Sequence, residues 1–123
     1  MDVVGFVHSM LDVNMSIRYV AVVDREYRLL ASDQRENVPS FTPNETDRNF
    51  MTVVPPLIVD AVERLMPFLG EMEAISVRYE KALLTFHRSG NLVIVMSFGP
   101  GVLTPFLSQI TREFEKRKSE FLT

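Results

Sequence analysis

Seven residues, Leu92–Phe98, constrain the fold of this chain more than any other segment. They read Leu-Val-Ile-Val-Met-Ser-Phe, so apolar residues occupy nearly every position instead of every second or every third one. A short apolar run rich in β-branched residues predicts a strand, and its lack of polar alternation predicts that both faces of this strand are buried. We therefore expect a sheet in which this strand is central and helices cover both faces.

Four other segments supply strands for such a sheet. Residues 75–79 alternate apolar and polar side chains, and residues 82–86 form a second apolar run. The turn Ser89-Gly90-Asn91 connects that run to the central strand, so three consecutive antiparallel strands are expected. Nearer the start, residues 17–23 and 27–31 are rich in β-branched and aromatic residues around a short charged turn, which predicts a hairpin.

Three segments have the three- and four-residue apolar spacing of amphipathic helices. They are Val3–Leu11, residues 57–65 and residues 103–114. The second of these has charged residues on its other side, and we expect Pro67 and Gly70 to end it.

The stretch of residues 32–47 is polar, contains Pro39 and Pro43, and predicts a loop. Thr46 or Asp47 is suited to cap a helix that begins there. Because Pro55-Pro56 has no amide hydrogens to donate, we expect any such helix to be interrupted or kinked at that pair.

These elements predict one α/β (α+β) domain over residues 1–123, with a single five-stranded antiparallel sheet and flanking helices in the order α-β-β-α-β-β-β-α. A chain of 123 residues has the usual size of one domain, and no segment is a candidate linker. Apolar residues make up 46% and charged residues 24%, which favours a globular fold over disorder.

Charge and composition also disfavour several kinds of partner. A formal net charge of -3 gives no basic surface for nucleic acid. The absence of cysteine removes disulfides and thiolate sites and fits a cytoplasmic location. No apolar stretch approaches the ~20 residues that cross a bilayer, so we expect no membrane association.

The sequence shows no pattern typical of catalysis. His8 and His87 are far apart and lie in no metal-binding motif, so we expect two partly exposed histidines, no metal and no cofactor. The sequence contains no nucleophile motif. Gly99-Pro100-Gly101 lacks the other residues of a phosphate-binding loop, so it predicts a turn that leads into the last helix. We expect a protein that is not an enzyme.

The apolar pattern continues past the second helix through Met66, Pro67, Phe68 and Met72. Core packing is one explanation, because methionine fills irregular gaps. The other is an adaptable contact surface that a partner or a twin subunit covers.

Residues 18–32 combine an apolar strand, an acidic turn and a second strand that ends in Ala-Ser, and residues 79–114 run strand-strand-helix. Both stretches, and the order of the elements, resemble the roadblock/LC7 group of the profilin-like superfold, and small archaeal proteins look similar too. The chain departs from the family at Glu26-Tyr27, where Asp-Gly is usual, and at Pro55-Pro56 within the central helix.

The resemblance implies a non-catalytic protein-interaction module. Roadblock-like proteins form homodimers or heterodimers and act as scaffolds or regulators of small GTPases, and the family pairs its third strands and packs its second helices. By element order, the implied dimer or partner surface comprises Leu57, Ala61, Leu65, Met66, Ile75, Val77 and Tyr79.

Two other functions stay open on the sequence. One is a small-molecule sensor of profilin-like or PAS-like type, with a pocket between the sheet and the proline-containing segment. Phe41, Phe50 and Phe86 are its candidate lining residues, although core packing explains each of them equally well. The other is an enzyme whose site is assembled between subunits.

Overall fold

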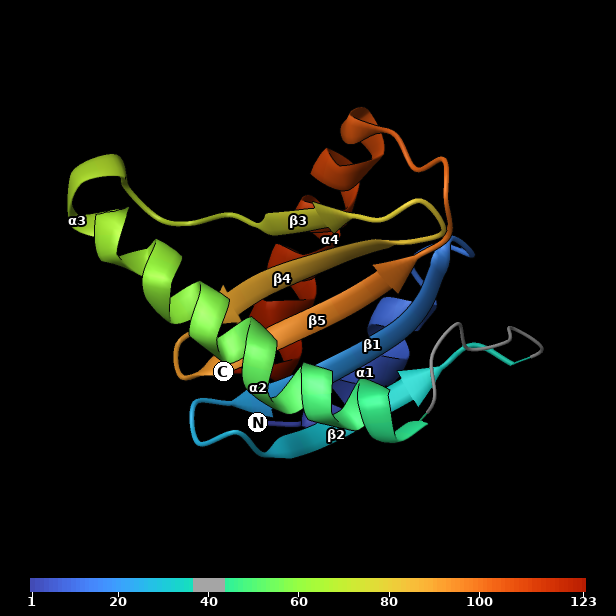
Figure 1. The fold of residues 1–123 in the computed structure, drawn as a ribbon, viewed down its shortest axis with the longest axis horizontal. Helices are drawn as coiled ribbons and strands as arrows, with labels where there is room; N and C mark the ends of the chain where they lie inside the picture. Colours follow the sequence, from blue (N-terminus) through green and yellow to red (C-terminus); the bar gives the residue numbers. More distant parts are fainter. Residues whose placement is uncertain (37–43) are drawn as a thin grey trace.

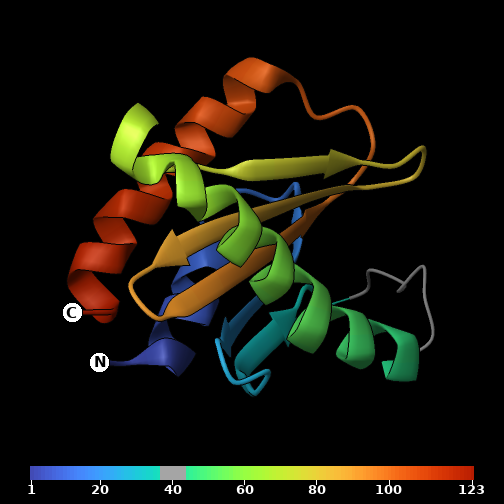
Figure 2. The same cartoon turned by 60° about the vertical axis from the view of Figure 1, so that its left-hand side comes forward.

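The computed structural model describes residues 1–36 and 44–123, which form three layers (Figure 1). A five-stranded sheet lies between α2 on one face and α1 with α4 on the other, and the rotated view separates these layers clearly (Figure 2). In chain order the elements are α1 (Val3–Leu11), β1 (Ile17–Asp24), β2 (Leu29–Gln34), α2 (Asn44–Val62), the 3-10 helix η1 (Glu63–Leu65), α3 (Met66–Leu69), β3 (Ile75–Arg78), β4 (Leu83–Ser89), β5 (Leu92–Phe98) and α4 (Thr104–Phe121).

The sheet has the strand order β2-β1-β5-β4-β3, and every neighbouring pair is antiparallel. Strand β5 lies at its centre, where Ile94 is opposite Val22 of β1 and His87 of β4. Six of the seven β5 residues are buried, all except Ser97. The predicted central strand and the predicted five-stranded antiparallel sheet are both confirmed, and β2 and β3 form the two edges.

The two faces of the sheet bury separate hydrophobic clusters. Phe6 of α1 and Phe114 of α4 pack in the first cluster, with their ring centroids 6.0 Å apart. Met51 and Val59 of α2 pack in the second, against residues such as Phe86. Among the described residues, no helix is long and apolar enough to span a membrane.

Helix α2 begins at Asn44 and continues through Pro55 and Pro56 to Val62, so the predicted interruption at this proline pair is wrong, while the alternative of a kink stays a prediction. The prolines remove only their own amide donors, and both rings are buried on the side of the helix that carries Met51 and Val59. Their contact with the core offsets the lost hydrogen bonds.

The helical segment also differs from the predictions at its two ends. Residues 44–47 belong to α2, so Thr46 and Asp47 lie inside the helix instead of capping it, and the predicted loop is shorter than expected. Pro39 and Pro43 lie outside the described residues. At the other end Pro67 lies within α3, and Gly70, at φ 91°, ends the helix as predicted.

The turn between β1 and β2 is held by the carboxylate of Asp24. It accepts hydrogen bonds from the backbone N–H groups of Glu26 (2.8 Å) and Arg28 (3.0 Å) and from Nε of Arg28 (2.8 Å). Burial alone raises the pKa of Asp24, but these hydrogen bonds outweigh it and hold the pKa below its ordinary value. Tyr27 adopts φ 64°, and no other non-glycine residue in the described part of the chain has a positive φ.

We expect Tyr27→Gly to raise the free energy of unfolding by about 0.5–1 kcal/mol, because a left-handed backbone costs a residue with a Cβ about 1–2 kcal/mol and glycine avoids this cost at some loss of chain entropy. Glu26→Gly, in the same turn but without a positive φ, is the matched control and should lower the free energy of unfolding. Urea unfolding measures both, and an equal loss of stability in the two variants would contradict the assignment of strain to Tyr27.

Candidate interaction surface

Helices α2 and α3 expose a row of apolar side chains on the side that faces away from the sheet. Phe68 and Leu69 are 81% and 78% exposed, and Leu57 and Leu65 are about half exposed. Met51, Val59 and the two prolines occupy the side of α2 that faces the sheet. The apolar residues predicted to form a stripe over residues 57–65 therefore face outward, except for Ile58, which packs partly against the core. We name this row the α2–α3 outer face, and it consists of Val53, Leu57, Ala61, Val62, Leu65, Phe68 and Leu69.

Strand β3, which follows α3 in the chain, forms one edge of the sheet, and within the described residues its backbone pairs only with β4. Ile75 and Val77 pack against the same cluster as α2 and are only partly buried, while Tyr79 is 51% exposed. Ser76 and Arg78 are exposed, and Nη2 of Arg78 donates to the carbonyl of Val102, 2.6 Å away. The predicted strand residues thus lie at a free sheet edge, on the face that α2 partly covers.

The residues predicted from the sequence divide between these two neighbouring features. Leu57, Ala61 and Leu65 are exposed on the α2–α3 outer face, and Met66 is partly buried at the start of α3. Four of the seven predicted interface residues, Leu57, Ala61, Leu65 and Tyr79, are therefore open to solvent.

Two of the three phenylalanines predicted to line a ligand pocket, Phe50 and Phe86, lie in the described part of the chain. Phe86 is completely buried in the core, and Phe50 packs partly buried against the same cluster. Phe41 lies outside the described residues. The ligand pocket therefore stays a prediction.

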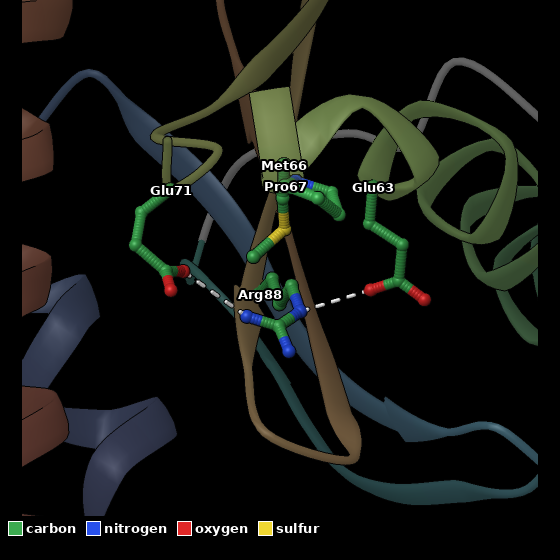
Figure 3. Close-up of a pocket in the computed structure, with 5 residues that line it drawn as sticks. All are labelled: Glu63, Met66, Pro67, Glu71 and Arg88. Atoms are coloured by element: carbon green, nitrogen blue, oxygen red, sulfur yellow. Dashed lines mark hydrogen bonds and ion pairs between the residues drawn. The ribbon is translucent and has the colours of Figure 1, made fainter. Parts of the chain in front are cut away.

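A charged cluster ties the end of α2 to two hairpins. Both terminal nitrogens of Arg25, in the β1–β2 turn, donate to the carboxylate of Glu63 at 3.0 and 3.1 Å, and the Arg25 side chain also pairs with Asp60. Nε of Arg88, on β4, donates to Glu63 at 2.9 Å, and its Nη1 contacts Glu71 at 3.3 Å (Figure 3). Bidentate pairing of this kind is geometrically specific, so Glu63 holds α2 in place over the sheet.

Three residues of this cluster, Glu63, Glu71 and Arg88, line an open depression together with Met66 and Pro67 (Figure 3). The hydrogen bond from Arg25, supported by Arg88, lowers the pKa of Glu63 below its ordinary range. A carboxylate that is held ionised between two guanidinium groups is a poor general base, so this arrangement points to a structural role. No sequence pattern predicted this cluster, because Glu63 lies 25 positions from Arg88 and 38 positions from Arg25.

His87 is buried, so the expectation of a partly exposed side chain is wrong for this residue. Its ring lies 4.8 Å from that of Phe114, because β4 is an inner strand and α4 covers this face. Nε2 lies 3.0 Å from the hydroxyl of Thr85, and the backbone of Glu73 is nearby, but no atom of the described residues forms a hydrogen bond with Nδ1. Burial therefore dominates and lowers the pKa of His87 to about 4.

The other histidine, His8, is mostly exposed and lies 2.6 Å from a carboxylate oxygen of Asp33. Across residues 1–36 and 44–123, the His, Asp and Glu side chains form no group of three or more that could hold a metal ion.

Solved structures resemble the whole of this architecture. No protein-family model matches the chain, and no curated protein matches it in sequence. The roadblock/LC7 domain from Streptomyces avermitilis superposes with a TM-score of 0.71 at 8% identity, over 99% of this chain and 98% of that one. This chain has the roadblock/LC7 fold.

Two further structures, one of them a profilin, have a similar fold. MglB, solved in a tetrameric arrangement, gives a TM-score of 0.70 at 17% identity, over 94% of this chain and 84% of that chain. Schizosaccharomyces pombe profilin gives 0.56 at 13% identity, over 94% and 95% of the two chains. The predicted roadblock/LC7-like, profilin-like fold is confirmed, whereas the likeness to small archaeal proteins gains no support from these structures.

Because His87 is buried, we expect the free energy of unfolding to decrease as the pH is lowered. Its folded pKa of about 4 is below the value of about 6.5 in the unfolded chain, so the unfolded state binds more protons between these values. The His87 contribution is therefore complete above pH 6.5 and is lost as pH falls toward 4, by about 3 kcal/mol.

Urea unfolding at pH 7.5, 5.5 and 4.5 measures this loss. His87→Leu should flatten the dependence, while the same change at exposed His8 should keep the His87 contribution. An identical pH dependence in wild type and His87→Leu would show that the buried imidazole is not responsible.

Proposed function

We propose that this chain is a non-catalytic protein-interaction domain that pairs with a second copy of itself, or with a related subunit, through the α2–α3 outer face and the edge of β3. One observation carries this proposal: a row of exposed apolar side chains on α2 and α3 precedes, by residues 70–74, a sheet edge that is unpaired in the described part of the chain. The proposed interface comprises Leu57, Ala61, Leu65, Met66, Ile75, Val77 and Tyr79.

Both features are unfavourable in an isolated domain. Exposed large apolar residues in one region mark a surface that another molecule covers. The free edge of β3 presents backbone N–H and C=O groups that a further strand can pair with. A two-fold axis at this edge would bury the apolar residues and pair the backbone groups in one contact. The same surface of each copy then meets its twin, so the assembly is a closed dimer.

The fold supports a role in assembly beyond the pair itself. In this proposal the single domain of residues 1–123 works in the cytoplasm as a scaffold or regulator of a small GTPase, the role implied by its resemblance to the roadblock group. A similarly folded protein, MglB, has been solved in a tetrameric arrangement, which agrees with assembly from repeated copies. The carboxylates of the charged cluster are held in ion pairs, which agrees with a non-catalytic task.

We expect Val77→Lys to weaken self-association by about 3 kcal/mol, or more than a hundredfold in dissociation constant, because it places two like charges at the centre of a buried contact. Sedimentation at several concentrations measures this. Leu65→Lys tests the helix side of the same surface without touching the core, since Leu65 is 55% exposed. Val4→Lys, at an equally exposed apolar residue of α1 on the other side of the sheet, is the matched control and should leave association unchanged.

A wild-type protein that stays monomeric throughout the micromolar range would contradict the homodimer. In that case the exposed surface would serve a different chain.

Affinity capture from the native cell tests the GTPase part of the proposal. We expect a small GTPase to be recovered with the wild-type protein and identified by mass spectrometry. Repeated captures that return no GTPase would contradict this assignment while leaving the self-association result unaffected.

A further inference from the structure

We infer that residues 67–71, which we name the α3 tip, form a second interaction site and bind a partner protein at an apolar groove bordered by lysine or arginine. Phe68 and Leu69 belong to the α2–α3 outer face, but they are not among the seven residues proposed to pair two copies. The inference therefore goes beyond the proposed self-association, and separate measurements test it.

The apolar side chains of the α3 tip are more exposed than the leucines that precede them. Phe68 and Leu69 are 81% and 78% exposed, compared with 50% for Leu57 and 55% for Leu65. Every residue from 67 to 71 is exposed, and α3 lies at the outer end of the long helical segment, away from the strands (Figure 1). Large apolar side chains in such a position mark contact with another molecule, and an exposed aromatic ring is a typical anchor in a partner's pocket.

One arginine holds the α3 tip in place from both sides. Arg88 of β4 donates from Nε to Glu63 at 2.9 Å and from Nη1 to Glu71 at 3.3 Å, so it fixes the residues before and after α3 (Figure 3). Gly70, at φ 91°, turns the chain, and its amide donates to the carbonyl of Met66 at 2.9 Å. The apolar side chains therefore project from a backbone that is already ordered, which lowers the entropic cost of binding.

The charge beside the α3 tip indicates the chemistry of the partner. Glu71 is 80% exposed and contacts Arg88 through only one of its carboxylate oxygens, and Glu73 is exposed as well. Arg64 is an exposed cation, but it lies four residues before Phe68, so the acidic side of the tip is the side that follows α3. A partner with lysine or arginine on that side is attracted, and one with carboxylates there is repelled.

The open depression beside the α3 tip fits the side chain of such a cation. Its lining includes the thioether of Met66, the ring of Pro67 and the carboxylate of Glu71 (Figure 3). Lysine and arginine lay their aliphatic stems on apolar surface and keep their charge at its border. A partner cation can therefore reach the second oxygen of Glu71 while Phe68 enters the neighbouring groove.

The same charge makes two other occupants of the α3 tip less suitable. A bilayer that contains anionic lipids repels Glu71 and Glu73. A second copy of this chain carries a net charge of -3 and the same exposed carboxylates. Each of these occupants predicts a different experimental result from that of a basic protein groove.

An amphipathic helical peptide of leucine and lysine, which has an apolar stripe bordered by cations, is a suitable probe. We expect wild type to bind it about tenfold more tightly than the same peptide with glutamate in place of lysine. Phe68→Ser should weaken binding of the leucine–lysine peptide about tenfold because it removes the apolar anchor. Glu71→Lys should weaken it by a similar factor because it repels the probe. Fluorescence anisotropy of the labelled peptides measures all of these affinities.

Matched controls place the same changes on other helices. Val4→Ser on α1 and Glu120→Lys on α4, both at exposed positions, should leave the affinity for the peptide within about twofold of wild type. Equal binding by wild type, Phe68→Ser and Glu71→Lys would overturn the inference. Sedimentation of wild type with phosphatidylcholine vesicles, if Phe68→Ser abolished it, would assign the tip to a membrane and overturn it as well.

Self-association separates this inference from the proposed function. Phe68→Ser should dimerise as wild type does, whereas Val77→Lys should not. If Phe68→Ser raised the dissociation constant of the homodimer as much as Val77→Lys, the α3 tip would belong to the contact between copies and the inference would be wrong. A monomeric wild type that binds the peptide through Phe68 and Glu71 would contradict the proposed self-association alone.

Discussion

Strand β5 has apolar side chains on both faces, and neither face can be left in water without losing the free energy of burial, roughly 25 cal/mol for each Å² of apolar surface. Helices α1 and α4 cover one face and α2 covers the other, so the three-layer arrangement follows from this strand. The position of α2 follows as well. Met51, Val59 and the buried Pro55-Pro56 pair must face the sheet, and the bidentate contact between Arg25 and Glu63 holds the end of the helix there.

The placement of α2 leaves apolar side chains exposed to solvent on its outer surface. A helix that only covers a sheet carries polar residues on its outer surface, but α2 and α3 present leucine, valine and phenylalanine there. The edge strand β3 is short, its apolar residues Ile75 and Val77 are only partly buried, and in the described part of the chain no strand pairs with its outer side. Apolar helix surface and free backbone groups thus occur together, and a second copy of the chain can cover both through one symmetric contact.

The sequence predicted the strands and their antiparallel order well, because alternation and continuous apolar runs report directly on how many faces a strand buries. It predicted the outward stripe of Leu57 and Leu65 only as a pattern, since periodicity gives the angle between residues on a helix but not which side meets the core. The unbroken helix through Pro55 and Pro56 was missed because tertiary contacts outweigh a local cost. The burial of His87 and the Arg25–Glu63–Arg88 contacts depend on residues that only the folded chain brings together.

The central claim is that a second copy covers the free edge of β3, and amide hydrogen exchange measured at low and high protein concentration tests it most directly. The amides of Ser76 and Arg78 point outward from this edge, whereas the far edge, β2, has no part in the proposed contact. Our account predicts that exchange at Ser76 and Arg78 slows as concentration rises through the dissociation constant, while exchange at the outer amides of β2 does not change. Equally fast exchange at both edges at every concentration would contradict it.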